Sequence, residues 1–245
     1  MNALPGDDPM AVALVDAIRS GDLPTLRRLL TDHPDLATVG ITGSDSLGRT
    51  PLHVATDWPG YFPNGPGVVE ALLAAGADPS APLAGGSNPE TPLHWAASSD
   101  DVDVAAALIA GGADIEAPGA SIAGGGPLDD AVGYGCWHVA RLLVAHGARV
   151  DALWKAAALG LQARATALLD SDTRPIQDEL NHAFWQACHG GQRRMAEYLL
   201  ARGADINAVP GHTDQTPLDI AGSRDTRRDT LTDWLRDNGA IASNR

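Results

Sequence analysis

Six side chains in this sequence of 245 residues could take part in acid–base chemistry. They are Asp57, His94, Asp129, Asp130, Lys155 and His189. If the surface around them deepens into a pocket, Asp129, Asp130, Lys155 and His189 are the candidate catalytic groups. Burial beside Trp154 would lower the pKa of Lys155 and make its amine reactive. Each group also has a structural explanation, because acids suit the first turn of a helix and lysines are usually solvated or paired.

Metal and phosphate chemistry have little support in the sequence. His182, Cys188 and His189 lie close together along the chain but lack the ligand spacing of a zinc site. The run Gly124-Gly125-Gly126 lacks the Lys and the Ser or Thr of a phosphate-binding loop, and a turn before a helix explains it better. We therefore predict no metal and no cofactor.

Charge and composition restrict the class of partner. Asp and Glu number 31 against 17 Lys and Arg, which gives a formal net charge of −14. Phosphate backbones and anionic membranes repel such a chain, so we expect no nucleic acid and no membrane as partner. No apolar run approaches the roughly 18 residues of a membrane span, no secretory signal is apparent, and the 2 cysteines are too few for a disulfide framework. The expected location is the cytoplasm.

A repeated pattern organises most of the sequence. Its first half occurs as Thr50-Pro51-Leu52-His53, Thr91-Pro92-Leu93-His94, Gly126-Pro127-Leu128-Asp129 and Thr216-Pro217-Leu218-Asp219. Its second half occurs as Leu72-Leu73-Ala74-Ala75-Gly76-Ala77, Leu108-Ile109-Ala110-Gly111-Gly112-Ala113, Leu142-Leu143-Val144-Ala145-His146-Gly147-Ala148 and Leu199-Leu200-Ala201-Arg202-Gly203-Ala204. Alanines that mark the same position in seven successive copies are spaced by about 34 residues on average; they are Ala17, Ala55, Ala96, Ala131, Ala156, Ala187 and Ala221. At these residues the chain resembles the ankyrin repeat family.

Elementary helix chemistry explains the letters of the pattern. A Thr hydroxyl can accept a hydrogen bond from an unpaired amide one turn into a helix, and Pro suits the first helical position. Small alanines let neighbouring helices approach closely, and the Gly after the second apolar stripe ends that helix. A single helix pair cannot bury its own apolar face, so pairs must stack on one another.

The resemblance implies an all-α ankyrin repeat solenoid of about seven helix-turn-helix units with short projecting turns and capping repeats at both ends. We expect one domain over residues 10–240, with flexible tails at 1–9 and 241–245. The repeats are expected near 10–35, 50–79, 91–116, 126–150, 151–172, 181–207 and 216–240. The sequence departs from the family pattern at an insertion, Trp58–Gly67, and at a short step around Asp151–Leu153.

Aromatic side chains gather on the first helix of each repeat and the turn beyond it. The chain has 6 Trp, 3 Tyr and 2 Phe, and Trp and Tyr are common anchors at interfaces. We predict an aromatic, acidic concave groove with the insertion as a flap. The candidate binding residues are Asp57, Trp58, Tyr61, Phe62, Trp95, Tyr134, Trp154, Lys155, Trp185 and His189. Packing is the competing explanation for Trp154 and Trp185, which could fill volume between alanine-rich neighbours.

The function predicted on this basis is an interaction module that binds a protein or peptide, with the acids favouring a basic partner. Catalysis is not implied. The alternative is a protein that binds a small molecule, or a small biosynthetic enzyme, with its pocket in the concave face. A third possibility is that the aromatic residues cover the interface of a homo-oligomer.

Overall fold

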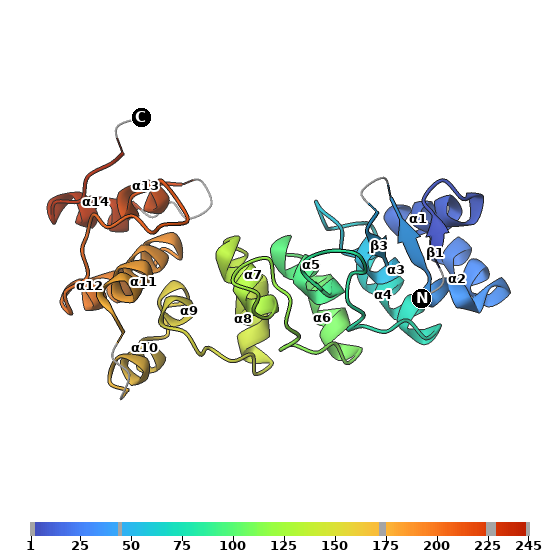
Figure 1. Cartoon of the computed structure of the whole chain (residues 1–245), viewed down its shortest axis with the longest axis horizontal. Helices are drawn as coiled ribbons and strands as arrows, with labels where there is room; N and C mark the ends of the chain where they lie inside the picture. Colours follow the sequence, from blue (N-terminus) through green and yellow to red (C-terminus); the bar gives the residue numbers. More distant parts are fainter. Residues whose placement is uncertain (1–2, 44–45, 172–174, 224–228, 244–245) are drawn as a thin grey trace. The chain divides into compact units, whose positions relative to one another are not determined.

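The computed structural model describes residues 3–43, 46–171, 175–223 and 229–243. The chain divides into two compact units, Met1–Ala148 (unit 1) and Arg149–Arg245 (unit 2). Both units consist mainly of paired helices (Figure 1). In the part of the chain that is described, no helix is both long enough and apolar enough to cross a membrane.

The described residues of unit 1 form four successive helix pairs. They are α1 (Pro9–Ser20) with α2 (Leu23–Asp32), α3 (Pro51–Ala55) with α4 (Gly65–Ala74), α5 (Pro92–Ser98) with α6 (Val102–Ala110), and α7 (Pro127–Gly133) with α8 (Trp137–Ala145). The first helices pack in the order α1, α3, α5, α7, and the second helices in the order α2, α4, α6, α8. Fully buried leucines such as Leu14, Leu52, Leu93 and Leu143 fill the space between the helices. The expected stacking of helix pairs is confirmed in this unit.

The Thr-Pro-Leu-His pattern begins helices as predicted. Thr50 Oγ1 accepts from the His53 amide at 3.3 Å, while the Thr50 amide donates to His53 Nδ1 at 3.3 Å. Burial lowers the pKa of His53 to about 4, so its ring is neutral and Nε2 carries the proton. That nitrogen donates to the Glu90 carbonyl at 3.1 Å, which ties one helix pair to the turn that precedes the next.

A small sheet precedes and follows the first helix pair. Strand β1 (Ala3–Pro5) runs parallel to β2 (Gly40–Thr42), and β2 runs antiparallel to β3 (Gly48–Arg49). Gly48 also bridges to Ala84 in the next projecting turn. The expectation of a flexible tail over residues 1–9 is therefore wrong for residues 3–5, and Met1 and Asn2 lie outside the described residues. Backbone pairing with β2 orders this segment, a contact that local sequence does not reveal.

Unit 2 contains α9 (Leu153–Ala158), α10 (Gln162–Leu169), α11 (Gln177–His189), α12 (Arg193–Leu200), α13 (Pro217–Ala221) and α14 (Asp229–Asp237). Helix α11 is the centre of this unit, because α9, α12 and α13 all pack against it. Its Phe184 is fully buried among small residues such as Ala156 and Ala187. At the C-terminus the Ile241 amide donates to Asn207 Oδ1 at 2.8 Å, so residue 241 is tethered, while residues 244–245 of the expected tail lie outside the described residues.

Candidate functional site

A hollow of about 320 Å³ opens in unit 1 beside the first helices of three successive pairs. Part of its lining comes from the segments that precede α3, α5 and α7. The rest comes from the segment that follows α3, from α5, and from the residue that follows α7. The lining residues are Arg49, Thr56, Asp57, Trp58, Glu90, Trp95, Ser98, Ser121 and Tyr134. Four of the predicted binding residues, Asp57, Trp58, Trp95 and Tyr134, are thus brought together. We call this feature the unit 1 hollow.

The aromatic residues of the hollow differ in their solvent exposure and in their contacts. Trp58 is 82% exposed and Tyr134 is 54% exposed, so both present large apolar surfaces to solvent. Trp95 is half-buried, and its indole N–H donates to Glu90 Oε2 at 3.1 Å. The guanidinium of Arg49 lies over its ring, 5.7 Å from the centroid. The hollow therefore combines one fixed indole with two exposed aromatic side chains.

Two carboxyl groups meet beneath the hollow. Asp130 in α7 is fully buried, and its Oδ1 accepts hydrogen bonds from the Ser121 hydroxyl at 2.9 Å and the Ile122 amide at 3.0 Å. Burial raises the pKa of Asp130 to about 7, and the nearby Glu90 carboxyl adds to the rise in that pKa. Asp130 Oδ2 has no hydrogen-bond partner among the described residues. Ser121 also lies 3.0 Å from the Tyr134 hydroxyl, so this network reaches the rim.

The predicted flap is a pinned loop. Its last residues, Gly65 to Gly67, already belong to α4, and Asp57 Oδ2 forms an ion pair with Arg19 at 2.7 Å. Gly21, with φ of 67°, leaves room for the loop, because a Cβ there would lie 2.0 Å from the Pro63 carbonyl oxygen. These contacts correct the flap hypothesis, since they fix the loop to the first helix pair.

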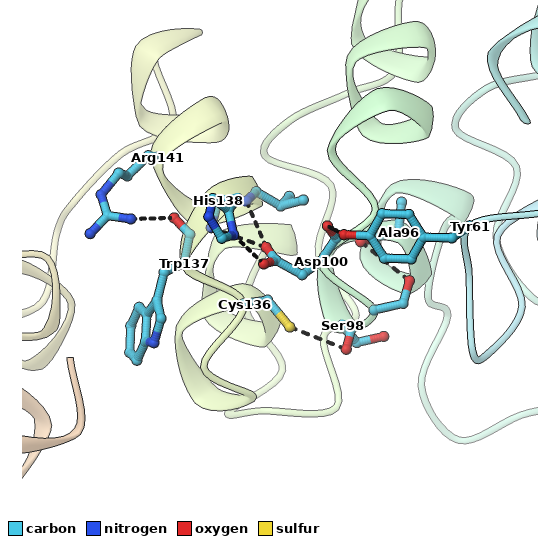
Figure 2. A network of polar contacts seen from close by, with 10 residues as sticks. Tyr61, Ala96, Ser98, Asp100, Cys136, Trp137, His138 and Arg141 are labelled. Carbon is cyan, nitrogen blue, oxygen red and sulfur yellow. Dashed lines mark hydrogen bonds and ion pairs between the residues drawn. The ribbon is translucent and has the colours of Figure 1, made fainter. Parts of the chain in front are cut away.

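A second set of contacts fixes the loop on its other side (Figure 2). The Tyr61 amide donates to Asp101 Oδ2 at 2.6 Å, and the Tyr61 hydroxyl donates to the Asp100 carbonyl. The Asp100 carboxylate in turn accepts from the amides of His138 and Val139 at the start of α8, at 3.0 and 2.9 Å. Tyr61 and the half-buried Phe62 therefore do not line the hollow; they position the loop that carries Trp58.

Removal of the Tyr61 hydroxyl should loosen this loop without unfolding unit 1. We expect Tyr61→Phe to cost about 1 kcal/mol locally, the usual net contribution of one hydrogen bond. Hydrogen exchange of the amides in residues 57–64 should accelerate about fivefold, which is the equivalent of that free energy. Unchanged exchange in this loop, with α5 and α6 also unchanged, would contradict the assigned role of Tyr61.

The predicted residues of unit 2 lie largely in its interior. Trp185 is only 5% exposed, and its indole N–H donates to the Gln215 carbonyl at 2.9 Å. It is a core residue, and its prediction as a surface anchor is corrected: the large ring fills space beside small neighbours. His189 is buried next to Trp185, with ring centroids 5.3 Å apart. Lys155 is buried as well, with Nζ 2.7 Å from Asp151 Oδ1.

A second hollow, of about 330 Å³, lies within unit 2. Half-buried Trp154 lines it and stacks on His182, with ring centroids 5.9 Å apart. Burial lowers the pKa of His182 to about 4, with a further lowering from His212. Of the binding residues predicted in this unit, only Trp154 lines this hollow.

The candidate catalytic groups do not form an open acid–base site. Asp129, Asp130, Lys155 and His189 are all buried, and none of them lines the unit 1 hollow or the second hollow beside Trp154. Asp129 accepts from the Gly126 amide at 3.1 Å and so caps the start of α7. His94 is fully buried in α5, where its Nδ1 accepts from the Thr91 amide at 3.0 Å. Among the residues described, no group of three or more His, Cys, Asp or Glu side chains is arranged to hold a metal.

The most informative lining residues missed from the sequence are Arg49, Glu90 and Ser121. A signal for the first two exists: Arg49 and Glu90 each stand directly before a Thr-Pro pair, at the same position of neighbouring repeats. Equivalent positions of stacked repeats face the same way, so side chains there must be neighbours. Ser121 does not stand directly before a Thr-Pro pair, so the repeat pattern does not indicate where its side chain lies.

Comparisons with known proteins agree with this architecture. Residues 61–153 match the family model for ankyrin repeats (3 copies), and residues 179–209 match the model for a single ankyrin repeat. Together the two matches cover about half of the chain. The chain belongs to the ankyrin repeat family. Its predicted fold class is confirmed, and ankyrin repeats are generally protein–protein interaction modules.

A solved structure supports the same ankyrin fold. The human ASB11 ankyrin repeat domain aligns over 94% of this chain and 99% of its own, with a TM-score of 0.53 and 18% sequence identity. At that identity the likeness establishes the fold alone. No curated protein matches the sequence.

Proposed function

We propose that this ankyrin repeat chain binds a protein or peptide through the unit 1 hollow. The observation that carries the proposal is the exposure of Trp58 and Tyr134, at 82% and 54%, on the rim of one hollow. Exposed Trp and Tyr side chains that a partner can cover are the commonest source of binding energy at interfaces. The rigid attachment of the loop that carries Trp58 lowers the entropy lost on binding.

The form of the hollow favours a broad partner over a small molecule. Its volume of about 320 Å³ is at the lower end of the range for small-ligand sites. Such sites enclose most of their ligand, whereas Trp58 and Tyr134 stand largely in solvent. A protein or peptide that lies across the rim would cover both rings and place one side chain in the hollow.

Truncation of the two exposed rings should remove partner binding. We expect Trp58→Ala and Tyr134→Ala each to weaken the affinity about thirtyfold, because loss of a well-packed aromatic anchor costs about 2 kcal/mol. Partners would first be isolated from cells of the source organism with the wild-type chain and then titrated, as purified proteins, by calorimetry.

Val12→Ala is the matched control, since Val12 is an exposed apolar residue of α1 in the same unit and lines no part of the hollow. It should bind like the wild type. If every purified partner binds the Trp58→Ala, Tyr134→Ala double variant with wild-type affinity, the proposed surface is wrong.

A further inference from the structure

The charges around the unit 1 hollow do not balance. Asp57 is matched by Arg19 at 2.7 Å, and Arg49 can match at most one further carboxylate. Glu90 and Asp130 contribute two carboxyl groups, one in the lining and one directly behind it. His94 in α5 adds no positive charge, because burial lowers its pKa to about 4 and leaves the ring neutral. Among the described residues at the hollow, one carboxyl group of the Glu90–Asp130 pair therefore lacks a positive counterpart.

Hydrogen bonding identifies where the positive charge is missing. The Trp95 indole N–H donates to Glu90, and Ser121 and Ile122 donate to Asp130 Oδ1. Asp130 Oδ2 is fully buried and has no hydrogen-bond partner among the described residues, and the Glu90 carboxyl raises the pKa of Asp130. Two ionised carboxylates have no hydrogen to donate to each other, so the pair must take up either a proton or a cation.

We propose that the unit 1 hollow receives one basic side chain of the protein partner, with the Glu90–Asp130 carboxyl pair as its counter-charge and Trp58, Trp95 and Tyr134 around its stem. This inference rests on the proposed function and names the chemistry that the hollow selects. The acids supply charge complementarity, and the aromatic faces attract a cation and cover its methylene groups. Arg49 already lies over one face of Trp95 at 5.7 Å, so a cation fits the electrostatics beside this ring.

Entry of a cation should displace the proton that the empty pair holds. The pKa of Asp130, raised to about 7, means that this carboxyl keeps its proton up to near-neutral pH. A nearby ammonium or guanidinium favours the ionised form, so binding releases that proton. The affinity for a basic probe should therefore be about tenfold higher at pH 8 than at pH 6, as linkage to one group with a pKa near 7 requires.

The test uses minimal probes and the whole chain. Nα-acetyl-lysine methylamide and Nα-acetyl-arginine methylamide are titrated at millimolar concentration, with the norleucine and glutamate analogues as uncharged and negative controls. The readout is the NMR signal of the Trp95 indole N–H, which is bonded to Glu90 and is assigned by its loss in Trp95→Phe. We expect saturable shifts with lysine or arginine, stronger at pH 8 than at pH 6, and none with norleucine or glutamate.

Variants show whether the charges of Glu90 and Asp130, and not only the volume of their side chains, are needed for binding of the basic probes. Glu90→Gln combined with Asp130→Asn keeps the volume of both side chains, removes both charges and should abolish the shifts. Asp103→Asn, which removes an exposed acid of α6 in the same unit, should leave them unchanged. Equal responses to norleucine and lysine, or an unaltered lysine response in the folded double variant, would overturn the proposal. So would the absence of a response to both basic probes. None of these results affects the test of Trp58 and Tyr134 against a purified partner, so the two proposals fail separately.

Discussion

Asp130→Asn is expected to stabilise unit 1 by about 3 kcal/mol at pH 8.5, relative to its effect at pH 4.5. The ionised Asp130 carboxylate pays a desolvation cost in its buried position beside Glu90, and its pKa of about 7 measures that cost against the ordinary value of 3.8. Asn keeps the oxygen that accepts from Ser121 and Ile122. It also adds an N–H group that can donate toward Glu90.

The direction of this pH dependence follows from the number of protons that the folded and unfolded chains bind. Between pH 3.8 and about 7 the folded wild type holds the Asp130 proton and the unfolded chain does not. The contribution of Asp130 to the free energy of unfolding therefore falls by about 1.4 kcal/mol per pH unit across this window and is flat above it. The Asn variant lacks this dependence, so its advantage grows as the pH rises.

Two buried histidines contribute a pH dependence of stability in the opposite direction, so the comparison must remove their contribution. Burial lowers the pKa of His53 and His94 to about 4, so their contributions to stability are lost as the pH falls from 6.5. They are present in both proteins, so the difference between variant and wild type reports Asp130 alone. The free energies of unfolding of variant and wild type are compared by urea unfolding at pH 4.5 and 8.5, with hydrogen exchange of α5 and α7 as the readout. Asp103→Asn is the surface control. A difference that does not change with pH would contradict the buried carboxyl pair.

Gly190→Ala is expected to destabilise unit 2 by about 3 kcal/mol, which is a large cost for one methyl group. Gly190 follows α11, and a Cβ there would lie 1.9 Å from the Ala158 carbonyl oxygen at the end of α9. Its φ of −75° is accessible to any residue, so the cost is steric. The backbones of α9 and α11 would have to separate, and the packing around Phe184 would loosen with them.

Gly222→Ala provides a closely matched control. Gly222 also follows a helix of unit 2, α13, with φ of −87° and ψ of −3°. An added Cβ would meet only the Leu218 and Asp219 carbonyl oxygens, at 3.4 and 3.5 Å, which are ordinary contacts. We expect this variant to be neutral or stabilised by about 0.5 kcal/mol, because alanine reduces the freedom of the unfolded chain. Equal thermal stability of the two variants would show that α9 and α11 do not approach as closely as described.

The helix starts could be predicted from the sequence because their determinants are local. A Thr before Pro-Leu, with His or Asp three residues after the Thr, carries its own capping bonds, and α3, α5 and α13 begin at the predicted prolines. The strand β1 could not be predicted in this way. Its order comes from pairing with β2, more than thirty residues further along the chain.

The candidate site was predicted only in part, for the same physical reason. Trp58 and Tyr134 were found because large aromatic side chains in turns are seldom core residues. Trp185 looked equivalent in the repeat pattern, yet it is buried because α11 is surrounded by α9, α12 and α13. Glu90 lies in the turn before α5 and Asp130 lies in α7, the first helix of the next pair, so only the stacking of repeats brings these two carboxyls together.

Site-directed photo-cross-linking shows whether a protein partner covers the rim of the unit 1 hollow. A photoreactive phenylalanine analogue would replace Trp58, Tyr134 or, as the control, Val12, and the chain would be irradiated in cells of its source organism. We expect covalent capture of the same protein through positions 58 and 134, and none through position 12. Capture through Val12 with none through either rim position would contradict it.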